Sequence, residues 1–164
     1  MKFFRGIAPA AAVAFSTCSS SGTLPVTFKN TQENLGVSRK ISSFVLPLGA
    51  TLNMDGAAIY QGIAVVFIAQ VSGVELTLSQ LLIVIFTTIL ASIGAAGVPG
   101  AGLVMLAMVV SAAGLPLEGI ALVAGVDRIF DMGRTTVNIT GDAACTMCVD
   151  AWEKKREAKQ NKAA

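Results

Sequence analysis

Two long stretches of this 164-residue sequence contain no charged residue. Leu76 to Leu117 is a run of 42 residues without Asp, Glu, Lys or Arg, and Gly56 to Val74 is a second run of 19. A helix needs about 20 mostly apolar residues to cross the hydrocarbon core of a bilayer. Charged residues make up only 13% of the chain, against about 25% in a typical soluble domain. The sequence therefore predicts an all-α polytopic membrane protein embedded in a lipid bilayer.

Several kinds of chemistry are excluded by what the chain lacks. It has no histidine, which excludes Ser-His-Asp and Cys-His catalysis and His-ligated zinc. A net charge of +2 gives no reason to expect a nucleic-acid partner. Cys145 and Cys148 form a C-x-x-C pair without a second ligand pair, and Cys18 makes the cysteine count odd. We interpret the C-x-x-C pair as two small residues near a helix end, with a metal or redox role as the alternative.

The distribution of Lys and Arg predicts the topology. Basic residues lie in the loop 29–40 and in the tail 153–164, whereas the loops 72–77 and 115–118 have none. The positive-inside rule places both basic segments, and so the C-terminus, on the cytoplasmic side. An even number of crossings must then separate them. We expect a helix over 41–71 to cross outward and a helix over 119–152 to return.

The segment 79–114 must then enter and leave the membrane on the same side. Its centre, residues 92–102, contains four glycines and one proline, which disfavour a regular helix. The flanks of 13 and 11 residues are each too short to cross about 30 Å of hydrocarbon. We predict a re-entrant hairpin here. We predict a second re-entrant hairpin over residues 1–30, with a polar tip over 18–23. A signal peptide over 1–17 is the alternative, but it leaves the Ser cluster at the tip unexplained.

Polar residues interrupt both predicted crossing helices. In the last helix, Asp127, Asp131, Arg134, Asn138 and Asp142 fall on one stripe at about 100° per residue. Charges inside a membrane are costly and usually face a cavity or one another. A purely structural Asp131–Arg134 pair at i, i+3 would leave the other stripe residues unexplained.

The crossing helix over 41–71 carries an N-M-D-G segment beside helix breakers, which predicts local unwinding at Asn53 and Asp55. These groups, with Asn138 and Asp142, supply the oxygen ligands that a hard cation such as Na⁺ prefers. Arg134 is suited to bind a carboxylate bidentately. The residues alone therefore indicate a cation-coupled carrier of a small zwitterion or acid.

Four motifs carry a family resemblance: AFSTCSSSGTLPVTFKN (14–30), LPLGATLNMDGAA (46–58), ASIGAAGVPGAG (91–102) and DRIFDMGRTTVNITGD (127–142). With them the chain resembles the sodium:dicarboxylate / glutamate transporter family, the amino acid:cation symporters. The resemblance implies two re-entrant helical hairpins plus two transmembrane helices, one with the unwound NMDG segment. It also implies Na⁺-coupled symport by elevator-type alternating access, with H⁺ as the alternative coupling ion.

The resemblance also implies the site residues. The substrate-binding set is Cys18, Ser19, Ser20, Ala57, Val98, Asp131, Arg134, Thr135 and Asn138. One sodium site maps to Gly49, Asn53, Asn138 and Asp142, and a second, built largely of carbonyls, maps to Thr51, Met54, Ser92, Ile93 and Ala95. A third shares Asn53 and Asp55 with a helix that this sequence lacks.

The family has six further helices before these motifs, which form a homotrimer scaffold. The resemblance therefore implies that residues 1–152 are the C-terminal part of the transport domain, followed by a basic cytoplasmic tail over 153–164. We expect a gene fragment, a split gene or a mis-assigned start codon. A non-transporting fragment that lacks the scaffold half is one alternative.

Four positions bear on the substrate. Ala57 stands where members with acidic substrates usually have Thr, and Cys18 and Met132 stand where some members have a second Arg. Arg134 is kept, and it marks a substrate with a side-chain carboxylate. We favour glutamate, aspartate or a dicarboxylate, with serine, alanine or threonine as the alternative. An intramembrane aspartyl protease fits poorly, because Arg134 would keep a neighbouring aspartate ionised and an aspartyl dyad must share a proton.

Overall fold

The computed structural model describes residues 2–163 and contains only helices within that range. Residue 1 of the predicted first hairpin and residue 164 of the tail lie outside it. The prediction of an all-α protein is confirmed. The helices in chain order are α1 (Lys2–Thr17), α2 (Ser20–Glu33), α3 (Arg39–Leu52), α4 (Asp55–Val71), α5 (Leu78–Gly94), α6 (Ala101–Ala112), the 3₁₀ helix η1 (Leu117–Gly119), α7 (Ile120–Ala124) and α8 (Asp127–Ala163).

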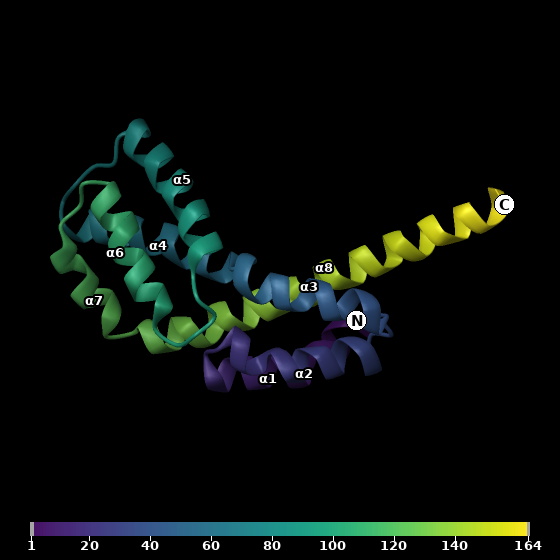
Figure 1. Ribbon diagram of the computed structural model, residues 1–164. Helices are drawn as coiled ribbons and strands as arrows, with labels where there is room; N and C mark the ends of the chain where they lie inside the picture. The colour runs from purple at the N-terminus through teal and green to yellow at the C-terminus, as the bar shows by residue number, and fades with distance from the viewer. Residues whose placement is uncertain (1, 164) are drawn as a thin grey trace.

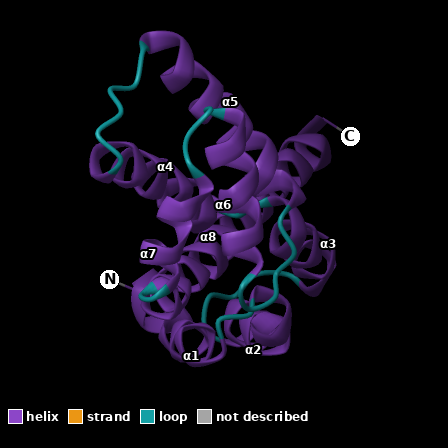
Figure 2. Ribbon diagram, turned by 90° about the vertical axis from the view of Figure 1, so that its left-hand side faces the viewer, coloured by secondary structure: helices purple, strands orange, loops and turns teal. Residues whose placement is uncertain are grey.

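Helix α8 is the axis on which the other elements pack (Figure 1). The antiparallel pair α1–α2 and helix α3 lie along its middle, whereas α4, α5, α6 and α7 gather around its N-terminal end (Figure 1). Seen end-on, α1 and α2 lie on one side of α8 and α5 on the opposite side (Figure 2). One buried cluster, centred on Val65, Ile68 and Leu106, joins α4, α5 and α6. A second, centred on Ile7 and Ile139, joins α1 to α8. The second cluster fixes the α1–α2 hairpin on α8, whereas the first fixes the α5–α6 hairpin on α4, which itself packs against α8.

The chain leaves helical geometry between α3 and α4. Asn53 has φ −112° and ψ 76°, and Met54 has φ −104° and ψ 54°. Gly56 follows in the first turn of α4, where a β-carbon would overlap the backbone of Arg134. Only glycine therefore allows α4 to approach α8 this closely. The interruption directs the side chains around residues 53–56 toward α8.

Three boundaries differ from those predicted. The segment 119–152 is not one helix, because the chain bends at Gly125 and Val126 between α7 and α8. Helix α8 then continues through the tail to Ala163, since residues 153–163 contain good helix formers and neither Gly nor Pro. The polar tip predicted over 18–23 is shorter: only Cys18 and Ser19 separate the helices, and Ser19 accepts a hydrogen bond from the Gly22 amide as the N-cap of α2.

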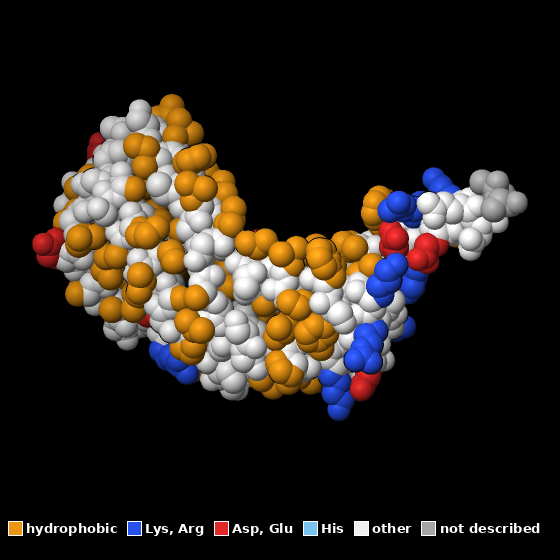
Figure 3. Space-filling model, viewed as in Figure 1, with side chains coloured by type: hydrophobic (Ala, Val, Ile, Leu, Met, Phe, Trp, Pro, Cys, Tyr) orange, Lys and Arg blue, Asp and Glu red, His pale blue; other side chains and the backbone are white. Residues whose placement is uncertain are grey.

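Large apolar side chains cover much of the surface of α3, α4 and α5 (Figure 3), among them Phe44, Leu82 and Phe86. Exposed apolar area on this scale is uncommon on soluble monomers. Within the described residues, the helical stretch Arg39–Val71, which spans α3 and α4, has the length and hydropathy to cross a bilayer. Helices α5 and α6 are apolar but shorter.

Candidate functional site

The tips of the two helical hairpins meet at Gly97. Its carbonyl oxygen accepts a hydrogen bond from the Ser19 hydroxyl at 2.8 Å and from the Ser21 amide at 3.2 Å. A β-carbon on Gly97 would lie 2.8 Å from the Ser21 hydroxyl oxygen and 3.1 Å from the Ala50 carbonyl oxygen. The α5–α6 tip thus lies directly on the α1–α2 tip, at a position with no room for a side chain.

A buried charge cluster on α8 lies beneath these tips. The Arg134 guanidinium forms two ion pairs, through Nη2 with Asp127 at 3.1 Å and through Nε with Asp131 at 3.0 Å. The Tyr60 hydroxyl donates to Asp127 at 2.8 Å, and its ring centre lies 4.3 Å from Cζ of Arg134. Arg134, Asp127 and Asp131 are all 5–6% exposed. The positive charge is therefore matched inside the protein, as a low-dielectric environment requires.

The α5–α6 tip covers this cluster. The Gly100 amide, at a left-handed φ of 79°, donates to Asp131 at 3.1 Å. Gly102 is in close contact with the Arg134 guanidinium. Nη1 of Arg134 is buried and has no hydrogen-bond partner among the described residues. One donor of the guanidinium is thus left available for a ligand.

A small cavity lies between the tips and α8. The centre of a water molecule can occupy about 20 Å³ of this cavity. That is room for about one or two waters and too little for an amino acid. A ligand of that size therefore requires the tip to move. The cavity is lined by Cys18, Ser20, Met54, Ala57, Ala95, Ala96, Gly97, Val98, Ala101, Gly102, Asp131, Arg134, Thr135 and Asn138.

The structure brings the predicted substrate-binding residues together at this cavity. All of them line it except Ser19, which lies beside it and contacts Gly97 through its hydroxyl. Val98 is half exposed at the tip, whereas Thr135 and Asn138 are buried on α8. Cys18 is buried at the α1–α2 junction with a positive φ of 53°, a conformation that is uncommon for residues other than glycine.

The predicted first sodium set also converges. The Asn53 amide donates to Asp142 at 2.9 Å. Gly49 packs against the Asp142 carboxylate, and a β-carbon on Gly141 would lie 2.8 Å from Nδ2 of Asn53 and 3.1 Å from Oδ2 of Asp55. Asn138 lies one turn away, where its side-chain oxygen accepts the Gly56 amide at 2.7 Å. Two carboxylates and two carboxamides from α3, α4 and α8 are therefore neighbours at the helix interruption.

The second sodium set is only partly assembled. Met54 and Ala95 share a buried cluster with Ala57. The hydroxyls of Thr51 and Ser92 each bond to a carbonyl of their own helix, Leu48 and Ile89 respectively. Ile93 is 48% exposed. Among the described residues, no three His, Cys, Asp or Glu are grouped as metal ligands.

Two residues of the charge cluster are absent from the predicted set. Asp127 and Tyr60 hold the guanidinium of Arg134, although neither lines the cavity. The sequence carried a signal for both. Asp127 lies on the same helical stripe as Arg134, and Tyr60 follows Ala57 by three residues on the same face of α4.

Comparison with known proteins shows the family of this chain. Residues 1–152 match the model of the sodium:dicarboxylate symporter family. An excitatory amino acid transporter of Caenorhabditis elegans is 51% identical over 141 residues, which are 86% of this chain and 28% of that protein. Human excitatory amino acid transporter 2 is 50% identical over 86% of this chain and 25% of its own length. Mouse excitatory amino acid transporter 3 is 49% identical over 94% and 29%.

The described residues fold only into helices, and the matched relatives are named as transporters. The chain belongs to the sodium:dicarboxylate symporter family. It spans about a quarter of the length of the curated relatives that it matches.

Proposed function

We propose that the full-length protein carries an acidic amino acid, glutamate or aspartate, or a related dicarboxylate across the cell membrane together with Na⁺. One observation carries the proposal: the buried Arg134 guanidinium, fixed by Asp127 and Asp131, keeps Nη1 without a partner at the cavity. A carboxylate is the group that matches a guanidinium in charge and geometry. The relatives named as excitatory amino acid transporters support the same substrate class.

A bound substrate would replace contacts that residues of the closed site now make with one another. Asp131 now accepts from the Gly100 amide and from Nε of Arg134. A substrate ammonium would take the place of the Gly100 amide on Asp131, while its side-chain carboxylate would bind Arg134. Ser20, Thr135 and Asn138, with the backbone of the hairpin tips, would hold the α-carboxylate. The tip over 94–102 opens to admit the ligand and closes behind it, which excludes water from the buried charges.

Sodium would occupy the interruption between α3 and α4. Asn53, Asp55, Asn138, Asp142 and the Gly49 carbonyl offer oxygen ligands there, and a hard monovalent cation is bound by such groups. A bound Na⁺ would also lessen the repulsion between Asp55 and Asp142. The second set, at Thr51, Met54, Ser92, Ile93 and Ala95, would complete its ligands from backbone carbonyls as the α5–α6 tip settles. Proton coupling is the alternative.

The membrane arrangement follows the same proposal. The α1–α2 and α5–α6 pairs are re-entrant hairpins, α3–α4 and α8 cross the bilayer, and the C-terminus is cytoplasmic. The two basic segments meet at one end of the molecule, where the Ser38 amide donates to Asp150 at 3.1 Å and Lys154 contacts the Gly36 carbonyl at 3.5 Å. Elevator-type alternating access and a homotrimer belong to the full-length protein.

Competitive uptake tests the substrate class. Full-length protein in liposomes, with Na⁺ outside, is offered labelled aspartate with an excess of unlabelled glutamate, succinate or serine. Competition by glutamate but not by serine supports the proposal. Competition by serine alone would favour the neutral alternative, for which the observation is that Ala57 and Cys18, rather than larger polar groups, line the cavity.

A further inference from the structure

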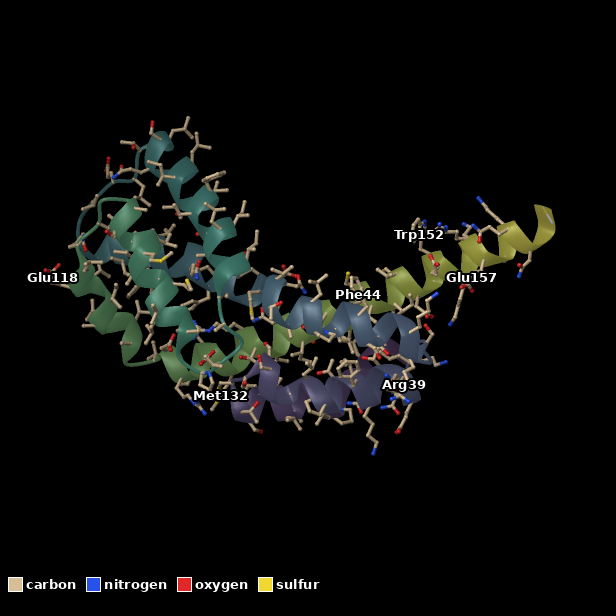
Figure 4. The ribbon with its side chains drawn as sticks, viewed as in Figure 1. Arg39, Phe44, Glu118, Met132, Trp152 and Glu157 are labelled. Atoms are coloured by element: carbon tan, nitrogen blue, oxygen red, sulfur yellow. The ribbon has the colours of Figure 1, made fainter. Side chains whose placement is uncertain are left out.

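The last three turns of α8 have their charges sorted onto two sides. With Trp152 as reference and about 100° per residue, Arg156, Lys159 and Lys155 fall at about 40°, −20° and −60°. Glu153 and Glu157 fall at about 100° and 140° on the other side. Figure 4 shows Trp152 and Glu157 projecting from opposite sides of this helix. One face is therefore cationic with a tryptophan at its base.

On the opposite face, Asp150 and Lys154 contact the loop between α2 and α3. Asp150 is 5% exposed, accepts the Ser38 amide at 3.1 Å and pairs with Lys154 at 2.6 Å. This face is turned toward the loop between α2 and α3. The cationic face consequently points away from the protein. Arg156 makes a 3.6 Å pair with Glu153, but both are partly solvated, so that pair is weak.

Trp152 marks the level at which the helix leaves the body of the protein. Its side chain is 63% exposed, and Cζ of Arg156 lies 5.9 Å from its ring centre. Exposed tryptophans favour the headgroup level of a bilayer, with an apolar ring and a polar N–H. Lys159 lies about 10 Å further along the helix axis. All three cations of the face are thus within about one Debye length of headgroups at the level of Trp152.

In the rest of the molecule, basic and acidic side chains also lie at opposite ends. The end of the molecule from which the C-terminal turns of α8 project also carries a group of Lys and Arg side chains (Figure 3), and Arg39 lies there (Figure 4). The opposite end exposes Glu75 and Glu118 in its loops, and Figure 4 shows Glu118 far from Arg39. Arg128, at the start of α8, is the exposed cation that departs from this pattern among the described residues.

We propose that this face of α8, made of Trp152, Lys155, Arg156 and Lys159, binds anionic lipid headgroups of the adjacent leaflet. Three cations beside an interfacial tryptophan, of which only Arg156 has an acidic partner and that a weak one, match the charge and depth of a phosphatidylserine-rich surface. A merely water-solvated charge run would not require the acidic residues to be confined to the other side. Binding would hold the cytoplasmic end of α8 at the membrane surface while the hairpin tips move, independently of which substrate is carried.

The single tryptophan of the chain gives a direct readout. The 164-residue chain is reconstituted into vesicles of phosphatidylcholine alone or with phosphatidylserine, and Trp152 emission is quenched with acrylamide and with brominated lipids. We expect weaker acrylamide quenching in the anionic than in the neutral vesicles and, within the anionic vesicles, stronger quenching when the phosphatidylserine is brominated than when the phosphatidylcholine is, with both effects reversed by high salt. Far-UV circular dichroism checks that all samples have the same helix content.

A charge-matched pair of variants assigns the effect to this face. Lys155→Gln with Arg156→Gln and Lys159→Gln should lower the ratio of lipid-bound to free helix by about 100-fold, at about 1 kcal/mol per basic residue. Lys2→Gln with Arg5→Gln and Lys29→Gln removes the same charge from α1 and α2 and should leave Trp152 protected. Equal protection in neutral vesicles, protection in neither, or equal losses in the two variants would each overturn the proposal.

Discussion

Arg134 and Asp127 form a buried ion pair on α8, with 3.1 Å between Nη2 and the nearest carboxylate oxygen. The pair joins residues seven positions apart, so it spans two helical turns. Asp131 takes Nε of the same guanidinium from the intervening turn. The orientation of Arg134 is therefore set by α8 itself, and Nη1 is the nitrogen left toward Gly102 and the hairpin tip.

The first prediction concerns the residues that orient the Arg134 guanidinium. Asp127→Ala should destabilise the protein by about 3 kcal/mol, the low end for a broken buried pair, because Asp131 still balances Arg134. Tyr60→Phe should cost about 1 kcal/mol through the lost hydroxyl bond to Asp127. The two losses should be less than additive in the double variant, since both remove the same contact. Thermal unfolding midpoints in detergent measure this, with Ser16→Ala on the surface of α1 as control; full additivity would show that Tyr60 and Asp127 are not coupled.

The second prediction concerns the closed tip. Gly97→Ala places a methyl group against Ser21 and Ala50, so it should break the two hydrogen bonds to the Gly97 carbonyl. Losing two bonds of about 1 kcal/mol each should favour the open tip by roughly 10- to 30-fold. Gly94→Ala is the matched control, because its β-carbon would meet nothing within 4 Å.

The readout is a cysteine introduced at Val98 in a background without Cys18, Cys145 and Cys148. An impermeant thiol reagent added outside should label it faster in the Gly97→Ala variant than in the Gly94→Ala variant, and substrate should slow the labelling. Equal rates in the two variants would remove the role of Gly97. Labelling from the cytoplasmic side alone would contradict the proposed topology.

Much of the site was predictable because its residues repeat at helical spacing. Asp131, Arg134, Asn138 and Asp142 share one face of α8, and a helical count alone places them together. The uncharged stretches likewise predict the all-helical fold. The convergence of that stripe with Cys18, Ser20 and Ala57 was expected only through the family resemblance, because contacts between residues more than 70 positions apart leave no local pattern.

Other features depend on tertiary contacts that helical spacing alone does not determine. Tyr60 belongs to the site because α4 crosses α8 closely enough to bring its hydroxyl to Asp127, and Gly56 permits that crossing. The bend at Gly125 and Val126 falls in an apolar stretch that reads as continuous helix. The change from apolar to charged residues after Trp152 predicts the end of the last helix there. Lys, Glu and Ala all favour helix, however, and α8 continues to Ala163.

The third prediction is sodium dependence. Uptake of labelled aspartate by the full-length protein should collapse when Na⁺ is replaced by choline, because the oxygen ligands near Asn53 and Asp142 need a small hard cation. Asp142→Asn keeps the shape but removes the charge, so it should raise the Na⁺ concentration for half-maximal uptake. Glu157→Gln, on the exposed end of α8, is the control. Equal uptake in choline and in sodium would contradict sodium coupling and favour coupling to protons.

The last prediction is that Arg134 selects acidic substrates. Its guanidinium lies buried beside the cavity, and an Arg–carboxylate pair in such a place is bidentate and hard to replace. Losing one partner of a buried pair costs about 3–5 kcal/mol, or roughly 10²- to 10³-fold in affinity. Arg134→Cys should therefore abolish transport of glutamate and aspartate, while serine or alanine can still bind through Asp131.

Arg134→Lys separates charge from geometry in the same assay. It should also transport acidic substrates poorly, because an ammonium lacks the planar fork and cannot reach Asp127, Asp131 and a ligand together. Lys40→Gln, an exposed cation on α3, controls for the loss of one positive charge. Unchanged glutamate affinity in Arg134→Cys would show that the substrate carboxylate binds elsewhere. A wild type that prefers serine would instead make Ala57 the better guide to the substrate.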